Sequence, residues 1–168
     1  MYELKQINKE SIPKTLEKAL RYRLLNEPLQ AESICRDVLE IDAENQQALT
    51  TLLLALTDQF EKELPGTFHD AQQLLPQIHS DYQRAYYEGI LNERWGNAHL
   101  GKGEPTSIGW FHAAMRCYAN AEALSDPDDD DAVLRWNTCA RIIQRYDFAP
   151  ESVSHDVAAE FGDDMPMR

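Results

Sequence analysis

Residues 13–45 read PKTLEKALRYRLLNEPLQAESICRDVLEIDAEN, and this stretch decides the fold. Apolar residues recur every three or four positions from Leu16 to Leu24, which is the spacing of one face of an α-helix. Pro28 interrupts the pattern, because proline cannot continue a helix but suits the first turn of a new one. The same spacing resumes after Pro28 and runs to Ile41. The stretch therefore predicts two helices joined by a tight turn.

Helical periodicity continues along most of the chain. Turn signals such as Pro65-Gly66 and Asp126-Pro127 separate the periodic segments, and none of them alternates as a β-strand does. Helices are predicted at residues 13–27, 29–41, 46–60, 68–80, 81–100, 110–124 and 130–146. The predicted fold class is all-α, with consecutive helices packed as antiparallel pairs.

The unit at 13–45 also carries small and aromatic residues where its two helices would cross closely, since a small side chain permits close approach. These residues are Ala19, Tyr22, Ala31, Cys35 and Val38. In length and pattern the unit resembles the tetratricopeptide repeat (TPR), a helix-turn-helix of about 34 residues. Ala43 departs from that family, which usually has proline there. The resemblance implies a short right-handed superhelix over residues 1–146, while a generic helical bundle fits the same apolar stripes.

Residues 147–168 are expected to form a separate, acidic C-terminal tail. Val153, Val157 and Phe161 recur every four residues, which fits one short helix. A lone helix of that length is marginal in water, so it gains stability only by docking. The tail is therefore interpreted as a cap on the last helices, a plug in the binding groove, or a solvated appendage.

The composition narrows the classes of partner. The 168 residues include 29 acidic and 16 basic side chains, a formal net charge of −13. A surface this acidic repels phosphate, which argues against nucleic acid and anionic membranes as partners. No apolar run would span a bilayer, and the N-terminal MYELKQINKE lacks the core of a secretory signal. Three widely spaced cysteines favour the reducing cytoplasm.

The acidic run Asp126–Asp131 is the strongest candidate for a cation site. Read as a calcium loop, it has Asp131 where glycine is needed and Asn137 where a bidentate glutamate is needed. The run fits better as a helix start, because aspartates there accept free N–H groups and complement the helix dipole. A metal-binding protein or small enzyme that uses this run remains an alternative function.

Other motifs give no support to catalysis. Residues 96–103, GNAHLGKG, resemble a phosphate-binding loop but lack its final hydroxyl and its preceding strand. The five histidines have no zinc or di-iron spacing, and no nucleophile motif is present. The sequence therefore predicts a protein that is not an enzyme, with no catalytic residue, metal or cofactor.

What the TPR resemblance implies is a concave groove, lined by the first helix of each pair, that binds a protein or peptide segment. The candidate groove residues are Arg23, Thr50, Thr57, Tyr86, Arg94, Asn137, Arg141 and Arg145. Their four arginines suit an acidic segment or a C-terminal carboxylate, because guanidinium pairs bidentately with carboxylate. Trp110, just after the glycine loop, is the aromatic residue expected to touch a ligand or a neighbouring chain.

A second alternative also follows from the resemblance. Some TPR proteins grip a chaperone tail with lysines and asparagines, but the matching places here include the apolar Leu16 and Leu20. Small acidic TPR proteins include bacterial type III secretion chaperones, which hold an apolar segment of an exported protein. An apolar groove would suit that role. The sequence predicts neither a particular partner nor an oligomeric state.

Overall fold

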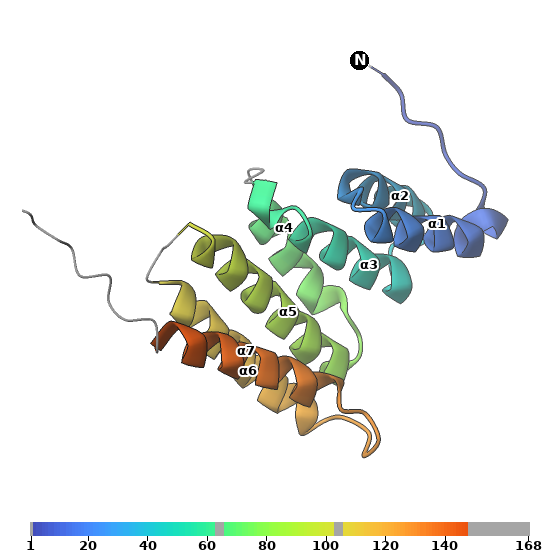
Figure 1. Ribbon diagram of the computed structural model, residues 1–168. Coiled ribbons are helices and arrows are strands. Elements are labelled where there is room, and N and C mark those ends of the chain that lie inside the picture. The colour runs from blue at the N-terminus through green and yellow to red at the C-terminus, as the bar shows by residue number, and fades with distance from the viewer. Residues whose placement is uncertain (1, 63–65, 103–105, 148–168) are drawn as a thin grey trace, which may run out of the picture.

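The computed structural model describes residues 2–62, 66–102 and 106–147, and these contain seven α-helices and no strand (Figure 1). The α-helices are α1 (Ile12–Leu24), α2 (Pro28–Ile41), α3 (Gln46–Thr57), α4 (Thr67–Leu74), α5 (Asp81–Leu100), α6 (Ser107–Glu122) and α7 (Asp131–Asp147). Short 3-10 helices occupy Lys9–Ser11, Phe60–Lys62 and Leu75–Gln77. The all-α class predicted from the sequence is confirmed. Among the helices described, none combines the length and apolar character needed to cross a membrane.

Local sequence signals set the helix ends. Pro28 stands at the first position of α2, where a missing N–H costs nothing. Asn26, between α1 and α2, has a φ of 58°, a left-handed conformation that asparagine tolerates better than most residues. The side chains of Asn45 and Ser80 accept backbone N–H groups at the starts of α3 and α5. Pro76 follows α4 and lies in a 3-10 turn, so that helix is short.

The helices pack in chain order. Each of α1, α2 and α3 contacts the next helix, and α5, α6 and α7 form the other closely packed group. In addition, α1 contacts α3 and α3 contacts α5, so alternate helices also lie against one another. Figure 1 shows the resulting row, from α1 and α2 at one end to α6 and α7 at the other. The C-terminal ends of α1 and α3 consequently lie on the same side as the second half of α5.

Small residues allow the close crossings. Ala19, Ala31 and Ala114 have no exposed surface, and a large side chain at any of them would overpack the crossing. Gly89 on α5 is still tighter, because a Cβ there would lie 2.6 Å from Cδ1 of Tyr118 on α6. A fully buried tyrosine ring therefore takes the space that a side chain at position 89 would need.

The acidic run is used to start α7, as expected. The Asp129 carboxylate accepts the N–H of Asp131 at 3.0 Å, and it is also hydrogen-bonded by the Tyr82 side chain of α5. Both contacts lower the pKa of Asp129, and the hydrogen bond from the backbone of Asp131 has the larger effect. Within the part of the chain that the structure describes, no group of three or more His, Cys, Asp or Glu side chains is placed to hold a metal ion. The acidic run therefore forms the turn between α6 and α7, and Asp129 attaches this turn to α5.

The predicted C-terminal tail lies outside the described residues, apart from Asp147 at the end of α7. The docking of Phe161 near Ile142 or Tyr146 and the occupation of the groove by the tail both remain predictions.

Candidate functional site

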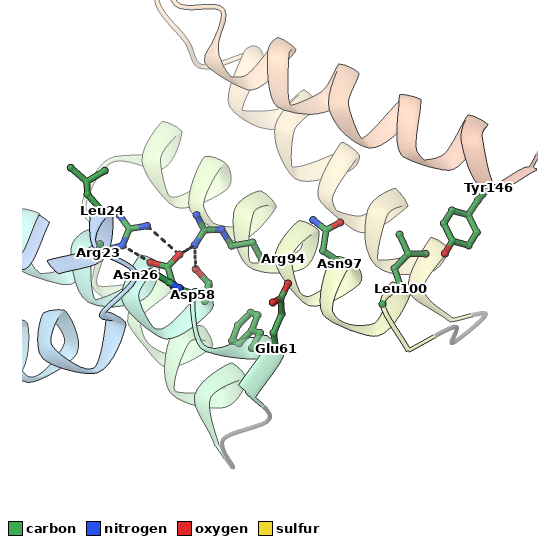
Figure 2. A pocket seen from close by; sticks show the side chains of 12 residues that line it. Arg23, Leu24, Asn26, Asp58, Glu61, Arg94, Asn97, Leu100 and Tyr146 are labelled. Atoms are coloured by element: carbon green, nitrogen blue, oxygen red, sulfur yellow. Dashed lines mark hydrogen bonds and ion pairs between the residues drawn. The ribbon is translucent and has the colours of Figure 1, made fainter. Parts of the chain in front are cut away.

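A surface cavity of about 700 Å³ lies where α1, α3 and α7 end, beside the C-terminal half of α5 (Figure 2). Its lining consists of Arg23, Leu24, Asn26, Thr57, Asp58, Phe60, Glu61, Arg94, Asn97, Leu100, Gly101 and Tyr146. Four alternate helices thus contribute to one concavity. Residues separated by more than a hundred positions line it together, since α1 packs on α3 and α3 packs on α5.

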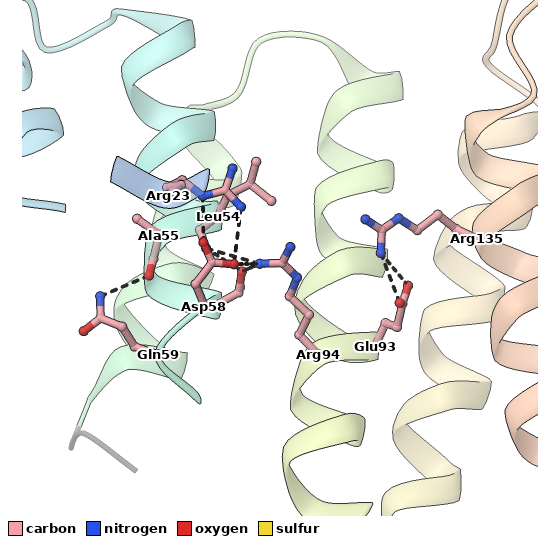
Figure 3. A network of polar contacts seen from close by, with 9 residues as sticks. Arg23, Leu54, Ala55, Asp58, Gln59, Glu93, Arg94 and Arg135 are labelled. Atoms are coloured by element: carbon pink, nitrogen blue, oxygen red, sulfur yellow. Dashed lines mark hydrogen bonds and ion pairs between the residues drawn. The ribbon is translucent and has the colours of Figure 1, made fainter. Parts of the chain in front are cut away.

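A carboxylate held by two arginines forms the polar centre of this cavity (Figure 3). Nε of Arg23 donates to Oδ2 of Asp58 at 2.7 Å, and its Nη2 donates to Oδ1 at 3.3 Å. Nη1 of Arg94 donates to the same Oδ1, to the Thr57 hydroxyl at 2.7 Å and to the Leu54 carbonyl at 3.3 Å. The cluster Arg23–Asp58–Arg94 therefore ties α1, α3 and α5 together.

The charges of this cluster do not cancel. Two guanidinium groups face one carboxylate, so the cluster carries one excess positive charge. Burial lowers the pKa of Arg94, and the neighbouring Asp58 carboxylate opposes that shift. The side chains of Arg23 and Arg94 keep 17% and 24% of their surface exposed, and both line the cavity.

Apolar side chains flank the polar centre. Leu24 lies at one end with 88% of its surface exposed, and Leu100 and Tyr146 lie at the other end (Figure 2). Asn97 stands between Arg94 and Leu100 and is exposed. Glu61 is a second carboxylate in the lining, and it is also exposed. The cavity is therefore amphipathic, which is the character of a surface that binds a chain segment.

The structure brings together three of the eight groove residues suggested by the sequence. Arg23, Thr57 and Arg94 line the cavity, and the Thr57 hydroxyl also donates to the Leu54 carbonyl. Thr50 does not line the cavity. Its hydroxyl donates to carbonyls of its own helix and contacts the Tyr87 side chain. Tyr86 packs on Tyr82 and Tyr118 instead.

The remaining candidates lie elsewhere. Asn137, Arg141 and Arg145 are on α7 but outside the lining, whereas Tyr146 is part of it. Trp110 is half-buried, and its ring packs edge-on against Phe68 with centroids 5.6 Å apart. Its Cβ would lie 3.2 Å from a Cβ added at Gly96, so α5 and α6 meet closely there. Trp110 does not line the cavity, and contact with a neighbouring chain remains a prediction.

Sequence reasoning missed most of the lining, including Asp58, Glu61, Asn97 and Tyr146. These residues fall within the last turn of a first helix or just beyond it. The signal that would have found them is the helix-end position itself. If alternate helices run parallel, their C-terminal ends meet on one side of the array, and the polar residues nearest each end are brought together.

A second network of the same chemistry surrounds a buried carboxylate, and we call it the closed network because that one carboxylate is matched by one arginine. Glu93, next to Arg94 on α5, has only 6% of its surface exposed. Nη1 of Arg135 donates to its two oxygens at 3.0 and 3.2 Å, and the Tyr118 hydroxyl donates to Oε2 at 2.5 Å. Burial lowers the pKa of Arg135, but the facing Glu93 carboxylate, Tyr118 and Tyr86 together outweigh it, so the pKa is raised. Glu93, Tyr118 and Arg135 join α5, α6 and α7.

Comparisons with known proteins gave no match to a family model, to a curated protein or to a solved structure.

Proposed function

We propose that the protein is a non-enzymatic binding module, built as a TPR-like helical array, whose cavity receives a segment of a partner protein. The observation that carries this proposal is the amphipathic cavity formed by the ends of α1, α3 and α7 beside α5. The concave surface of a repeat array is formed by the first helices of its repeats, and the cavity lies at the C-terminal ends of the helices in those positions. The packing of α1 on α3 and of α3 on α5 supports the same arrangement.

The shape and chemistry of the cavity favour a chain segment over a small molecule. A small-molecule site is enclosed and mostly apolar, with a few polar groups. Here Leu24, Asn26, Glu61 and Asn97 are all exposed in the lining, so the cavity is open along its length. An extended peptide can place alternate side chains against such a surface and leave the rest in water.

The cysteines favour a binding role as well. Burial raises the pKa of Cys35 to about 12, that of Cys117 to about 11 and that of Cys139 to about 12. A nucleophilic cysteine needs a pKa below its usual value, because the thiolate is the reactive form. All three thiols therefore behave as apolar packing groups.

Selection from a random peptide library displayed on phage tests the proposal. Peptides selected on the wild-type protein are assayed on two matched double variants. Leu24→Gln/Tyr146→Gln removes exposed apolar groups from the cavity, and Leu124→Gln/Leu134→Gln removes exposed apolar groups elsewhere. Burying the two cavity side chains against a ligand would stabilise the complex by about 1–3 kcal/mol.

We expect the cavity variant to weaken binding roughly tenfold and the control variant to leave it unchanged. Equal binding to both variants would place the peptide outside the cavity and would refute this proposal. Circular dichroism of both variants checks that they remain helical.

A further inference from the structure

We infer that the cavity recognises one carboxylate on its partner, an aspartate or glutamate side chain flanked by apolar residues, through the open edge of Arg94. This inference rests on the proposed function and specifies the ligand of the same site. Its occupant is an acidic–apolar segment of another protein.

The two arginines use their guanidinium groups differently. Arg23 holds Asp58 with Nε and Nη2, the edge that guanidinium presents to a carboxylate in a side-on bidentate pair. Arg94 holds Asp58, Thr57 and Leu54 with Nη1 alone. No described residue accepts a hydrogen bond from Nε or Nη2 of Arg94. The edge that binds a carboxylate in Arg23 is therefore unoccupied in Arg94, and Arg94 lines the cavity.

The excess charge of the Arg23–Asp58–Arg94 cluster matches a ligand with a single negative charge. Arg23 and Arg94 contribute two positive charges, and Asp58 neutralises one of them. Glu61 is exposed in the same lining and adds a negative charge, so the lining as a whole is neutral. One incoming carboxylate would meet the excess charge of the cluster, whereas a phosphate of two charges would be repelled by Asp58 and Glu61. The chemistry thus favours a carboxylate over a phosphorylated side chain.

The apolar ends of the cavity define the residues beside that carboxylate. Figure 2 shows Arg94 and Asn97 between Leu24 at one end and Leu100 with Tyr146 at the other. A segment whose acidic side chain reaches Arg94 would place its neighbours over these apolar side chains. The Asn97 amide would then contact the partner backbone, as an amide both donates and accepts hydrogen bonds.

Two matched phage libraries test this inference. Both display nine-residue peptides with random flanks, and the central residue is aspartate in one library and asparagine in the other. We expect the aspartate library to yield peptides that depend on the cavity, which means that they bind the Leu24→Gln/Tyr146→Gln variant more weakly than the wild-type protein. Replacing their central aspartate with asparagine should weaken binding roughly tenfold or more, since charge-assisted hydrogen bonds are about twice as strong as neutral ones.

Two protein variants change the charge of the lining without touching the Arg23–Asp58–Arg94 cluster. Asn97→Asp should weaken the aspartate peptides several-fold, and Glu61→Gln should strengthen them several-fold. Both positions are exposed, so the thermal midpoints should not change. The asparagine peptides serve as the neutral reference for each variant.

The outcomes separate the inference from the proposed function. Cavity-dependent peptides that bind equally with aspartate or asparagine would overturn the inference and leave the proposed function standing. Tighter binding when phosphoserine replaces the central aspartate would also overturn it. If neither library yields a cavity-dependent peptide, both the inference and the proposed function are wrong.

Discussion

Glu93 and Arg94 are neighbours on α5, yet they belong to two networks with opposite surroundings (Figure 3). Around Glu93, one carboxylate is matched by one arginine and one tyrosine hydroxyl, and the carboxylate and the tyrosine are buried. Around Arg94, two arginines share the single carboxylate of Asp58 beside an open cavity. The same residue types thus form a closed network on one side of α5 and an open one on the other.

The difference separates a network that holds the fold together from one that we propose recognises a partner. A buried carboxylate is stable only when it has hydrogen-bond partners, and Glu93 meets that condition. A guanidinium edge without a partner is tolerated only where water or a ligand can reach it. Arg94 meets this second condition because it lines the cavity. The four predictions below test the comparison by stability and binding measurements.

The largest expected effect comes from Glu93→Gln. This change removes the charge that faces Arg135 and leaves a partly buried guanidinium without a counterion. Breaking such a pair costs about 3–5 kcal/mol when fully buried, and the roughly one-third exposure of Arg135 places the loss near about 3 kcal/mol. Urea denaturation followed by circular dichroism measures the free energy of unfolding.

Glu88→Gln is the matched control, since Glu88 is an exposed residue of the same helix. It should change the free energy of unfolding by less than about 0.5 kcal/mol. If the two variants unfold at the same urea concentration, the closed network does not contribute to stability and the comparison fails.

The second effect comes from Gly89→Ala. The new methyl group would lie 2.6 Å from a ring carbon of Tyr118, which is fully buried. Overpacking of this kind costs about 1–3 kcal/mol, partly offset by the better helix propensity of alanine. We expect a net loss of about 2 kcal/mol, measured by urea denaturation.

Gly109→Ala is the control for Gly89→Ala. A Cβ at this exposed position of α6 meets no atom within 4 Å, so the change should stabilise the protein by up to about 1 kcal/mol. Opposite signs for the two variants would locate the effect in the Tyr118 contact. A gain of stability in both would show that Tyr118 yields easily and that its network is not rigid.

The third effect comes from Asp58→Asn. The Asp58 side chain is 21% exposed against 7% for Glu93, so the loss of stability should be smaller than for Glu93→Gln, about 1–2 kcal/mol. The excess positive charge rises at the same time, and the aspartate-centred peptides should bind more tightly. Isothermal titration calorimetry measures this affinity. Weaker peptide binding in the variant would mean that Asp58 itself contacts the ligand.

The sequence predicted the helices better than it predicted the cavity, for a physical reason. Helix periodicity and turn residues such as Pro28 and Asn45 act within a few positions, so they can be interpreted locally. The cavity depends on which helix ends meet, and that follows from packing between residues far apart in the chain. Arg23 and Arg94 were identified because they lie on faces of alternate helices that packing was not expected to use, whereas Asp58 resembled any other surface carboxylate.

Trp110 and Arg145 illustrate the opposite difficulty. An aromatic residue after a loop and an arginine on a helix face both fit a binding role in sequence. The structure places the Trp110 ring against Phe68 and leaves Arg145 outside the cavity that its neighbour Tyr146 lines. A step of one residue along a helix turns the side chain to a different face and decides whether it reaches the site. The periodicity of the sequence does not fix the rotation of a helix closely enough to predict this.

The smallest effect concerns pH and the closed network. Burial first, and then the adjacent Glu93 carboxylate, raise the pKa of Tyr118 above its usual value of 10.0. The folded protein therefore keeps the tyrosine proton at a pH where the unfolded chain loses it. This contribution to stability is complete below pH 10 and is lost as the pH rises above it, by about 0.8 kcal/mol at a pH near 10.5.

In Tyr118→Phe that loss should be absent, although the variant is less stable at every pH because one buried hydrogen bond is missing. The measurement is the change in unfolding free energy between about pH 8 and about pH 10.5 in both proteins. The contributions of Tyr82 and Tyr87 are the same in each, so they cancel when the two changes are compared. An identical decrease in the two proteins would show that the pKa of Tyr118 is not raised in the folded protein, and burial in the closed network would then not hold its proton.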